Sequence, residues 1–506
     1  MDKNYYITTP IYYVNDKPHI GHAYTSIACD VLARFKRLDG YSVKFLTGTD
    51  EHGQKVEKAA KSQNKSPLEY ANFISKDFKS LTKTLNLSND DFIRTTEKRH
   101  ILAAQSLWSK LYENKHIYLD KYSGWYALRD EAFYSEKEII NGKAPSGADV
   151  SWVEEESYFF DLSKWQDKLL EFYDKNPNFI LPKSRMNEVK SFVKGGLRDL
   201  SVSRTSFEWG VKVPNNDKHI MYVWLDALTN YLSAIGYPDT LENEYVNFWP
   251  ADIHMVGKDI LRFHAVYWPA FLMAAELPLP KRIFAHGWWT NEGKKISKSE
   301  GNVIDPLEII SSYGLDQIRY FLLREVPFGS DGDFSKTALL ARINGDLSND
   351  LGNLCQRVIS MIYKNCNGFI PRKCEKLNDR DIIFYNKSNA LYEKVKNEID
   401  KQSFHEAIKL IWAFISDANK YVDEQAPWKL RKTDERRMND VLWILADTIR
   451  KIAIIVQPFM PDSSTKILDQ LSIDISERDF SYLDSKHAIK TNKINSPSPI
   501  FPRIEE

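Results

Sequence analysis

The sequence has few cysteines. It contains four in 506 residues, namely Cys29, Cys355, Cys366 and Cys374. None of them forms a Cys-x-x-Cys pair, so the sequence indicates neither a zinc knuckle nor a disulfide framework. A chain of this kind fits a reducing compartment, and we expect a cytoplasmic protein.

Long hydrophobic runs are also missing. A membrane-spanning helix needs ~20 predominantly apolar residues, and no uninterrupted apolar stretch approaches that length. The start of the chain, Met1 to Tyr6, lacks the charged and then apolar pattern of a secretory leader. We therefore expect no membrane partner.

The chain carries no excess of charge of either sign. Its formal net charge is +0, which argues against a surface coated in basic residues for indiscriminate nucleic-acid binding. An RNA partner would have to be recognised by a local basic patch and by shape. The length is too great for one ordinary core and predicts two to four domains.

The beginning of the chain has the pattern of an α/β protein. Residues 5–11 are rich in Tyr, Ile and Thr and predict a buried strand. A polar loop follows, and helical periodicity begins near His22. Residues 42–46 predict a second strand. This order indicates a doubly wound, Rossmann-type parallel sheet, in which ligands bind at the carboxyl ends of the strands.

The pattern changes twice further along. Short aromatic strand-like pieces predict a small inserted domain, and sheet-like patterning returns at 220–225 and 253–257. After about Ala338 four stretches with helical periodicity, 339–361, 380–398, 403–421 and 435–455, predict an all-α helical-bundle domain. The expected parts are the first half of the sheet domain (1–116), the insertion (117–213), the second half of the sheet domain (214–290), a linking region (291–337) and the helical domain with its tail (338–506).

A first candidate motif is Pro18-His19-Ile20-Gly21-His22, between the first strand and its helix. Free N–H groups and the helix dipole favour anions at a helix start. His19 and His22 add donors, and Gly21 lets the backbone approach a ligand. Taken alone, a polar loop with two incidental histidines explains the motif equally well.

A second candidate motif runs from Gly293 to Asn302 and contains Lys294, Lys295, Ser297, Lys298 and Ser299. Such a loop is suited to binding polyphosphate, although alone it would be interpreted as a solvated charge run. The two motifs, in this order, resemble the signature motifs of class I aminoacyl-tRNA synthetases. The second has Ile296 where the commonest family form has Met.

Two groups of side chains have the spacing of a helix face. Ile260, His264 and Trp268 fall at i, i+4 and i+8, and therefore share one helical face. Trp224, Ala227, Leu228 and Tyr231 form the second stripe. On structural grounds alone such stripes are more often core than pocket. Both segments nevertheless closely resemble methionyl-tRNA synthetases, as do residues 9–15 and 47–53, and the resemblance covers essentially the whole chain.

The resemblance implies an ATP-dependent methionine–tRNA ligase. Mg·ATP and L-methionine would give methionyl-adenylate, and the methionyl group would pass to the 3′ end of tRNA(Met). Around methionine it implies Ile11, Tyr13, Asp50, Trp224, Ala227, Leu228, Tyr231, Ile260, His264 and Trp268, with Asp50 on the ammonium group. Around ATP it implies His19, Gly21, His22, Lys258, Asp259, Lys295, Ser297 and Lys298. His19, His22, Lys295 and Lys298 would be the catalytic residues.

The helical domain carries a further resemblance. Residues 353–357 and 421–428 look like the anticodon-reading segments of the family. Anticodon bases are single-stranded, so they can stack on an aromatic ring and form hydrogen bonds along their edges. Trp428 suits stacking, and Asn353 and Arg357 suit edge recognition. Without the resemblance, Trp428 would be interpreted as helix-packing core.

Two departures from the family pattern carry predictions. Many members bind zinc through a cysteine pair in the insertion, but residues 126–134 contain no cysteine. We therefore expect the zinc-free type, with the insertion held by aromatic packing. The chain also ends soon after the helical domain, without the C-terminal module that dimerises some longer members, so we expect a monomer.

Other functions share some of these motifs. Another class I synthetase is the nearest. The isoleucine, leucine and valine enzymes usually carry a large editing domain, and the insertion is too short for one. A cysteine enzyme would be expected to hold zinc with cysteine ligands. A non-catalytic tRNA-binding protein would not need His19, His22 and Lys298.

Overall fold

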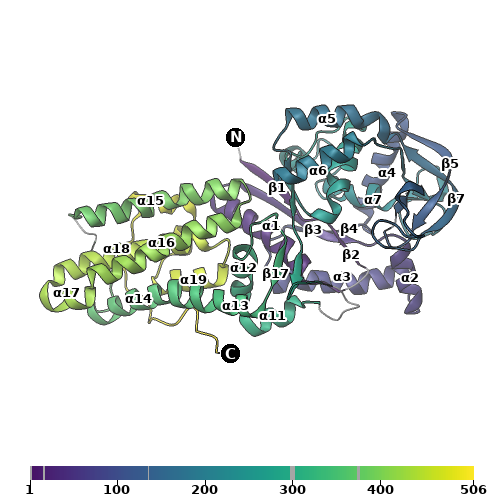
Figure 1. Cartoon of the computed structure of the whole chain (residues 1–506). Helices are drawn as coiled ribbons and strands as arrows, with labels where there is room; N and C mark the ends of the chain where they lie inside the picture. Colours follow the sequence, from purple (N-terminus) through teal and green to yellow (C-terminus); the bar gives the residue numbers. More distant parts are fainter. Residues whose placement is uncertain are drawn as a thin grey trace.

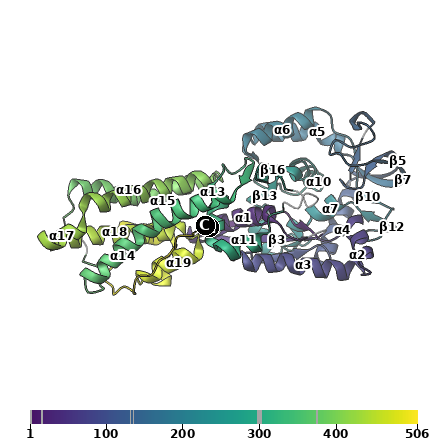
Figure 2. The same ribbon diagram turned by 60° about the horizontal axis from the view of Figure 1, so that its bottom comes forward.

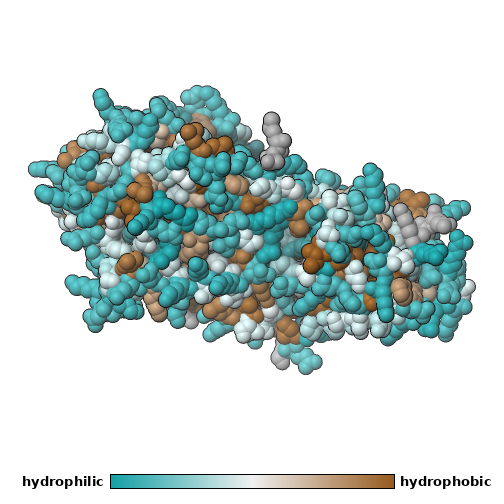
Figure 3. Space-filling view, turned by 180° about the vertical axis from the view of Figure 1, so that it is seen from behind, coloured by the Kyte–Doolittle hydropathy of each residue, from teal (hydrophilic) through white to brown (hydrophobic). Residues whose placement is uncertain are grey.

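The computed structural model describes residues 3–14, 17–130, 132–134, 136–296, 303–372 and 376–505. An α/β part and a helical part form the two ends of an elongated molecule (Figures 1 and 2). Within the described ranges, no helix is both long and apolar enough to cross a bilayer. Seen from behind, the surface is mostly hydrophilic, with scattered hydrophobic patches (Figure 3).

The centre of the α/β part is a parallel sheet. Its path is β2-β3-β1-β13-β14-β8, and β4 pairs with β3. Every pairing in it is parallel, as the doubly wound prediction requires. The strands are β1 (Asn4–Thr8), β2 (Tyr12–Tyr13), β3 (Ser42–Asp50), β4 (Asp91–Arg94), β8 (Ile180–Leu181), β13 (Ile253–Gly257) and β14 (Ile283–His286).

Three smaller sheets surround it. A four-stranded antiparallel sheet forms most of the inserted segment, with order β6-β5-β7-β9, and it lies at the end of the molecule opposite the helical part (Figure 1). The strands of the smaller sheets are β5 (Ile117–Ala127), β6 (Ala132–Tyr134), β7 (Ser151–Phe160), β9 (Leu200–Ser201), β10 (Ser203–Arg204), β11 (Lys212–Val213), β12 (Asn216–Met221), β15 (Trp289–Asn291), β16 (Lys294–Lys295) and β17 (Gly332–Phe334).

One predicted strand was wrong in part. The sheet-like segment 220–225 divides, because β12 ends at Met221 and helix α7 (Val223–Leu228) begins two residues later. β12 pairs antiparallel with β10 and β11 and does not join the parallel sheet. A short apolar run is compatible with either a buried strand or a buried helix, and only tertiary contacts decide which of the two forms.

Helices cover both faces of the parallel sheet. α1 (Ile20–Leu38) follows β1 and is buried along most of its length. The other helices of this part are α2 (Gln54–Ser62), α3 (Pro67–Thr84), α4 (Lys98–Glu113), α5 (Gln166–Lys175), α6 (Lys183–Lys194), α8 (Asn230–Ser233), α9 (Asn243–Phe248), α10 (Trp268–Ala274), α11 (Pro306–Tyr313) and α12 (Leu315–Arg324). Short 3-10 turns lie at Glu136–Glu138, Leu162–Trp165 and Lys258–Ile260, and a π-helical turn lies at Phe263–Tyr267.

The second part is the predicted helical bundle. Its helices are α13 (Lys336–Arg342), a π-helical stretch (Ile343–Gly352), α14 (Asn353–Asn365), α15 (Asp379–Asp400), α16 (Phe404–Gln425), α17 (Pro427–Thr433), α18 (Glu435–Val456) and α19 (Pro461–Gln470). Three 3-10 turns, Ile475–Glu477, Phe480–Leu483 and Ser485–His487, begin the C-terminal tail. One continuous hydrophobic cluster runs from α1 through α12 into this bundle, so the two parts share a core.

A buried arginine lies where the two parts meet. The Arg319 side chain on α12 is fully buried, and its guanidinium donates to Asp30 of α1 at 2.7 Å. It also donates to the carbonyl oxygens of Leu85, Pro458 and Phe459. Each of the three guanidinium nitrogens has an acceptor, and a buried charge paired in this way fixes geometry more than it adds stability. Arg319 therefore sets how α1 meets the turn between α18 and α19.

Candidate active site

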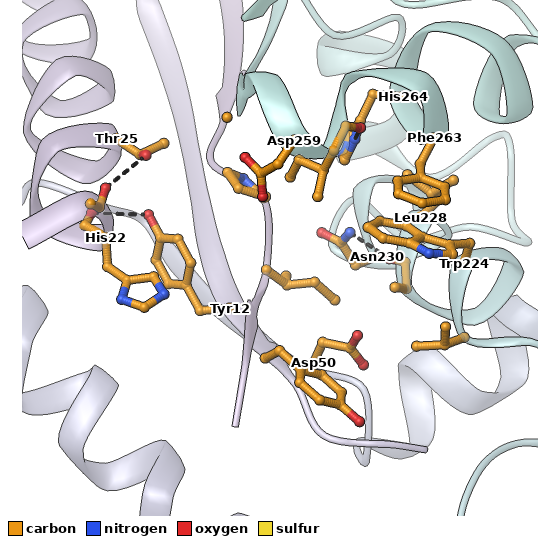
Figure 4. Close-up of a pocket in the computed structure, with 18 of the residues that line it drawn as sticks. Tyr12, His22, Thr25, Asp50, Trp224, Leu228, Asn230, Asp259, Phe263 and His264 are labelled. Atoms are coloured by element: carbon orange, nitrogen blue, oxygen red, sulfur yellow. Dashed lines mark hydrogen bonds between the residues drawn. The ribbon is translucent and has the colours of Figure 1, made fainter. Parts of the chain in front are cut away.

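A cavity of about 420 Å³ opens at the carboxyl ends of β1, β3 and β13. In the sheet β1 has β3 on one side and β13 on the other, so the winding direction changes there. Open parallel sheets bind ligands at such a switch point. Side chains of α1 lie on one side of the cavity and those of α7 and the π-helical turn on the other (Figure 4).

Most residues predicted around methionine lie at this cavity, although they come from segments far apart in the sequence. Trp268 does not line it. That side chain is fully buried, with its ring centroid 6.1 Å from that of Tyr231, and it packs behind Tyr231. The predicted residues that line the cavity are Ile11, Tyr13, Asp50, Trp224, Ala227, Leu228, Tyr231, Ile260 and His264.

The apolar wall of the cavity is built from paired rings. Trp224 of α7 stacks on Phe263, with the centroids 3.7 Å apart and the planes 8° apart. Next to them the Tyr231 hydroxyl lies 2.7 Å from Nε2 of His264. Flat aromatic surfaces and polarisable contacts of this kind suit a thioether side chain.

His264 is held as a neutral acceptor. Its Nδ1 lies 3.0 Å from the carbonyl oxygen of Ile260, to which it can only donate, so Nε2 accepts from the Tyr231 hydroxyl. Burial lowers the pKa of His264 from 6.5 to about 4. An uncharged ring in an apolar wall favours an uncharged substrate side chain.

A carboxylate faces this wall. Asp50 is the last residue of β3 and is 7 % exposed. Its side chain points into the cavity across from Trp224 and Leu228 (Figure 4). An amino acid placed between them would have its side chain on the rings and its ammonium group at the carboxylate.

The first motif forms the start of α1. His19 is the N-cap residue: its Nδ1 accepts from the backbone N–H of Gly21 at 3.1 Å, while Nδ1 of His22 accepts from the backbone N–H of His19 at 3.0 Å. Because both Nδ1 atoms accept, each neutral ring carries its proton on Nε2. A Cβ on Gly21 would lie 2.9 Å from Cε1 of His19, so the arrangement requires glycine.

Both histidines are uncharged donors. Burial lowers the pKa of His19 and of His22, and the neighbouring ring lowers that of His22 further. The two ring centroids are 3.9 Å apart. Their two Nε2–H groups, at the start of α1, are donors of the kind that phosphate oxygens accept.

The second motif begins in a β-hairpin. β15 and β16 form the hairpin, and Lys295 pairs with Thr290. Ser297 and Lys298 lie outside the described residues, as does the side chain of Lys295. Where the described chain resumes, the carbonyl oxygen of Ile304 accepts from the backbone N–H of Ile20 at 3.3 Å. The chain therefore returns from the second motif to the helix start that carries the first.

The two residues predicted for nucleotide contact after β13 differ in position. Asp259 lines the cavity and accepts from Nε1 of Trp288 at 3.1 Å. Lys258 is not among the lining residues; its ammonium group lies 2.6 Å from Asp331 and 4.2 Å from the centroid of the Trp288 ring. Both residues therefore lie beside Trp288, which directly precedes the hairpin in which the second motif begins.

The structure adds lining residues that sequence reasoning missed, among them Thr25, Phe263, His286 and Trp288. Nε2 of His286 lies 2.7 Å from the Thr25 hydroxyl, which joins the end of β14 to α1. Thr25 lies one turn beyond Gly21 on the same face of α1, so the helical spacing could have predicted that it lines the cavity. Nothing in the local sequence marks Phe263, because a π-helical turn sets its direction.

The inserted segment reaches the same cavity through Asp130. Its sheet is held partly by aromatic pairs, such as Trp125 with Trp152 at 5.4 Å, as the sequence predicted. Ala127, Ala144 and Ala148 form a small buried cluster in the same segment. Across the described ranges of the chain, no three His, Cys, Asp or Glu side chains are grouped so as to hold a metal ion.

The predicted anticodon residues lie on the surface of the helical part. Asn353 is exposed at the start of α14, and Arg357 lies one turn later on the same helix. The guanidinium carbon of Arg357 is 5.4 Å from the centroid of the Trp428 ring, which is 43 % exposed. Arg357 also donates to Asp423 at 2.6 Å. An exposed ring beside a cation is a platform on which a base can stack.

Three features together define a class I aminoacyl-tRNA synthetase: a parallel sheet with a histidine motif at its switch point, a lysine and serine sequence motif after which Ile304 bonds to the same helix start, and a helical domain. The family model "tRNA synthetases class I (M)" matches residues 5–150 and 137–359, and "Anticodon binding domain of methionyl tRNA ligase" matches 370–506. The chain belongs to the methionyl-tRNA synthetase family, and its reaction is that of a methionine–tRNA ligase.

Relatives match over their full length. The methionine–tRNA ligase of Rickettsia felis is 57 % identical over 100 % of this chain and 99 % of its own, and that of Brucella suis is 52 % identical over 100 % and 98 %. The Mycobacterium tuberculosis methionyl-tRNA synthetase in complex with methionyl-adenylate has a TM-score of 0.96 and 49 % identity, covering 99 % of this chain and 100 % of that one. The predicted family, fold class and activity are confirmed.

Proposed function

We propose that the cavity binds methionine with its side chain on the Trp224 and Tyr231 rings and its ammonium group at Asp50. The observation that carries this proposal is the convergence of nine predicted residues, from four segments of chain, on one cavity. The chemistry also agrees. The rings offer soft contacts to sulfur, and a mostly buried carboxylate gives the ammonium group a charge-assisted bond.

ATP would lie beside methionine, against the start of α1. In this proposal His19 and His22 donate Nε2–H to the phosphates, Gly21 lets the backbone approach, and Asp259 lies at the same edge. Mg²⁺ enters with ATP as part of the substrate, because this ion is usually held by phosphates and one or two carboxylates. Lys258 would be recruited from Asp331 when the nucleotide binds.

The first step would be an in-line displacement. A methionine carboxylate oxygen attacks the α-phosphorus, its bond to the β-bridging oxygen breaks, and pyrophosphate leaves with that electron pair. No side chain becomes covalently attached, so catalysis consists of positioning and charge stabilisation. From the sequence, Lys295, Ser297 and Lys298 would stabilise the phosphates from their loop.

The second step would transfer the methionyl group. A ribose hydroxyl at the 3′ end of tRNA(Met) attacks the adenylate carbonyl, and AMP leaves. The anticodon would be read by Asn353, Arg357 and Trp428, with one anticodon base stacked on the Trp428 ring. Their support is the exposed ring with a cation beside it.

The proposal for the whole chain follows the predicted divisions. We propose a first catalytic half (1–116), a connective insertion without zinc (117–213), a second catalytic half (214–290), a linking region (291–337) and an anticodon-binding domain (338–506). We further propose a cytoplasmic monomer. Sedimentation would test the monomer, and elemental analysis of the purified protein would test the absence of zinc.

The first experiment is amino-acid-dependent exchange of pyrophosphate into ATP, across all twenty amino acids. We expect exchange with methionine alone, lost with a chelator and restored by Mg²⁺. Exchange with another amino acid would mean that the pocket assignment is wrong while the phosphate chemistry holds. No exchange with any amino acid would favour a non-catalytic tRNA-binding protein.

A further inference from the structure

Helix α7 has a polar residue on the side away from the cavity. Trp224, Ala227 and Leu228 of this helix line the cavity, whereas Asp226 does not. The Asp226 side chain is fully buried. A buried carboxylate is costly unless it is paired, so its partners decide what it does.

Two histidines from distant segments meet this carboxylate. Nδ1 of His52 lies 2.7 Å from one oxygen of Asp226, and Nε2 of His100 lies 2.7 Å from the other. Burial by itself would raise the pKa of Asp226, but the two histidines lower it to about 2. The carboxylate is therefore ionised at neutral pH and accepts an N–H bond on each side.

His52 connects this carboxylate to the ammonium side of the cavity, because it lies two residues after Asp50. The connecting loop is itself held. Nε1 of Trp209 donates to the carbonyl oxygen of Glu51 at 2.6 Å, and the backbone N–H of Gly53 donates to the carbonyl oxygen of Trp209 at 3.0 Å. The His52 ring also packs edge-on against Trp209. A shift of His52 would therefore be transmitted to Asp50.

His100 holds the other side. This residue lies on α4, and its Nδ1 is 3.0 Å from the hydroxyl of Ser233 on α8. α8 also carries Tyr231, part of the aromatic wall. The Asp226 carboxylate, itself on α7, is thus linked through His100 to α8 and through His52 to the loop that carries Asp50.

We propose that Asp226 is a positioning residue for methionine: through His52 and His100 it fixes the distance between the Asp50 carboxylate and the Trp224 and Tyr231 rings. The inference rests on the proposed function, because it assumes that methionine spans these two sides. Asp226 does not line the cavity and acts only through its neighbours. A pocket whose two sides move apart loses methionine equally in the ground state and in the transition state.

The test is Asp226→Asn. Asparagine keeps the size, but it removes the charge and directs an amide N–H₂ at one of two N–H donors. We expect the KM for methionine in pyrophosphate exchange to rise about tenfold or more, with the KM for ATP and the kcat at saturating methionine changed less than about threefold, the signature of lost uniform binding.

Asp161→Asn is the matched control. Asp161 is another buried carboxylate bonded to an imidazole, that of His116 at 3.1 Å, but it lies outside the cavity. This change should lower the melting temperature without raising the KM for methionine. An Asp226→Asn variant that only loses stability, as the control does, would overturn the proposal.

His52→Phe keeps an aromatic ring at this position and removes the hydrogen bond to Asp226. This variant tests the same link if Asp226→Asn does not fold. It too should raise the KM for methionine, and the double variant should be little worse than the more affected single one, because both changes break the same link. Additive effects, or an unchanged KM in His52→Phe, would refute the link. If the wild type showed no methionine-dependent exchange, the proposed function would fail first.

Discussion

At the scale of single residues, the site places opposite demands on neighbouring side chains. Asp50 has to remain charged to meet an ammonium group, whereas His19, His22 and His264 are neutral because burial lowers the pKa of each. The same burial that makes the wall apolar keeps the imidazoles uncharged. The Asp50 carboxylate suits an ammonium group, and the neutral imidazoles of His19 and His22 suit phosphate oxygens.

The clearest residue-scale prediction concerns Asp50. Asp50→Asn keeps the shape and removes the charge, so we expect a loss of roughly 10- to 100-fold in kcat/KM for methionine, the range of one charge-assisted bond. Pyrophosphate exchange at varied methionine measures it. The exposed turn residue Asp239 is the control, and Asp239→Asn should have no effect. An unchanged kcat/KM in Asp50→Asn would remove Asp50 from the site.

His264 predicts how stability depends on pH. Burial lowers its folded pKa to about 4 from 6.5, so between these values the unfolded chain binds a proton that the folded chain does not. The free energy of unfolding should therefore fall as the pH drops from 6.5 toward 4. Urea titrations at several pH values would measure this. His264→Gln should show a shallower fall, and an equal slope would contradict the assignment.

At the scale of elements, the loop after β16 is expected to supply the charge on the phosphates. Lys298→Ala should leave methionine binding nearly intact and slow adenylate formation by roughly 100-fold or more, because it removes one stabilising charge from the transition state. A burst experiment measures the adenylate, and Lys336→Ala on α13 is the control. A normal burst in Lys298→Ala would exclude that role.

The hairpin that precedes this loop depends on β17. Asp333 accepts from the Thr290 hydroxyl at 2.5 Å and from the backbone N–H of Gly293 at 2.8 Å, which holds the turn of the hairpin. We expect Asp333→Ala to lower the rate of adenylate formation about tenfold, since the loop would be poorly placed, with little change in the KM for methionine.

A comparable aspartate provides the control for that change. Asp479 accepts from the backbone N–H of Ser481 at 2.8 Å, far away in the C-terminal tail. Asp479→Ala likewise removes a side-chain acceptor of a backbone N–H, without touching the hairpin, so adenylate formation should be normal. If both variants slow the reaction alike, a general loss of stability explains the effect.

At the scale of the whole molecule, the two parts are predicted to serve different steps. Trp428→Ala should raise the KM for tRNA in aminoacylation roughly tenfold, the range of one lost base stack, and leave pyrophosphate exchange unchanged. Phe369→Ala, another exposed aromatic residue of the helical part, should change neither. Equal losses of exchange and aminoacylation in Trp428→Ala would show that Trp428 is structural.

Local patterns predicted the large elements well. The four helical stretches of the bundle correspond to α13–α14, α15, α16 and α18, because a long apolar stripe with a period of 3.6 has few alternatives. The parallel sheet followed from the alternation of strand and helix. The prediction of a strand over 220–225 was wrong in part, because a run of six apolar residues does not distinguish a strand from a helix.

The site shows the same division. The histidine motif could be recognised because it is contiguous: its capping bonds join Gly21 to His19 and His19 to His22, residues two and three apart. Trp268 was placed with Ile260 and His264 on one face by assuming an α-helix throughout. The π-helical turn Phe263–Tyr267 closes its bonds one residue later, and Trp268 lies behind the wall.

By itself the sequence determined the elements, their order and the motifs that identify the family, because each is set by interactions within a few residues or within one contiguous stretch. Only the tertiary structure decided which side chains face the cavity and what holds them there. The partners of Asp226 lie 174 and 126 residues away, and such bonds leave no local period or spacing that a sequence could reveal.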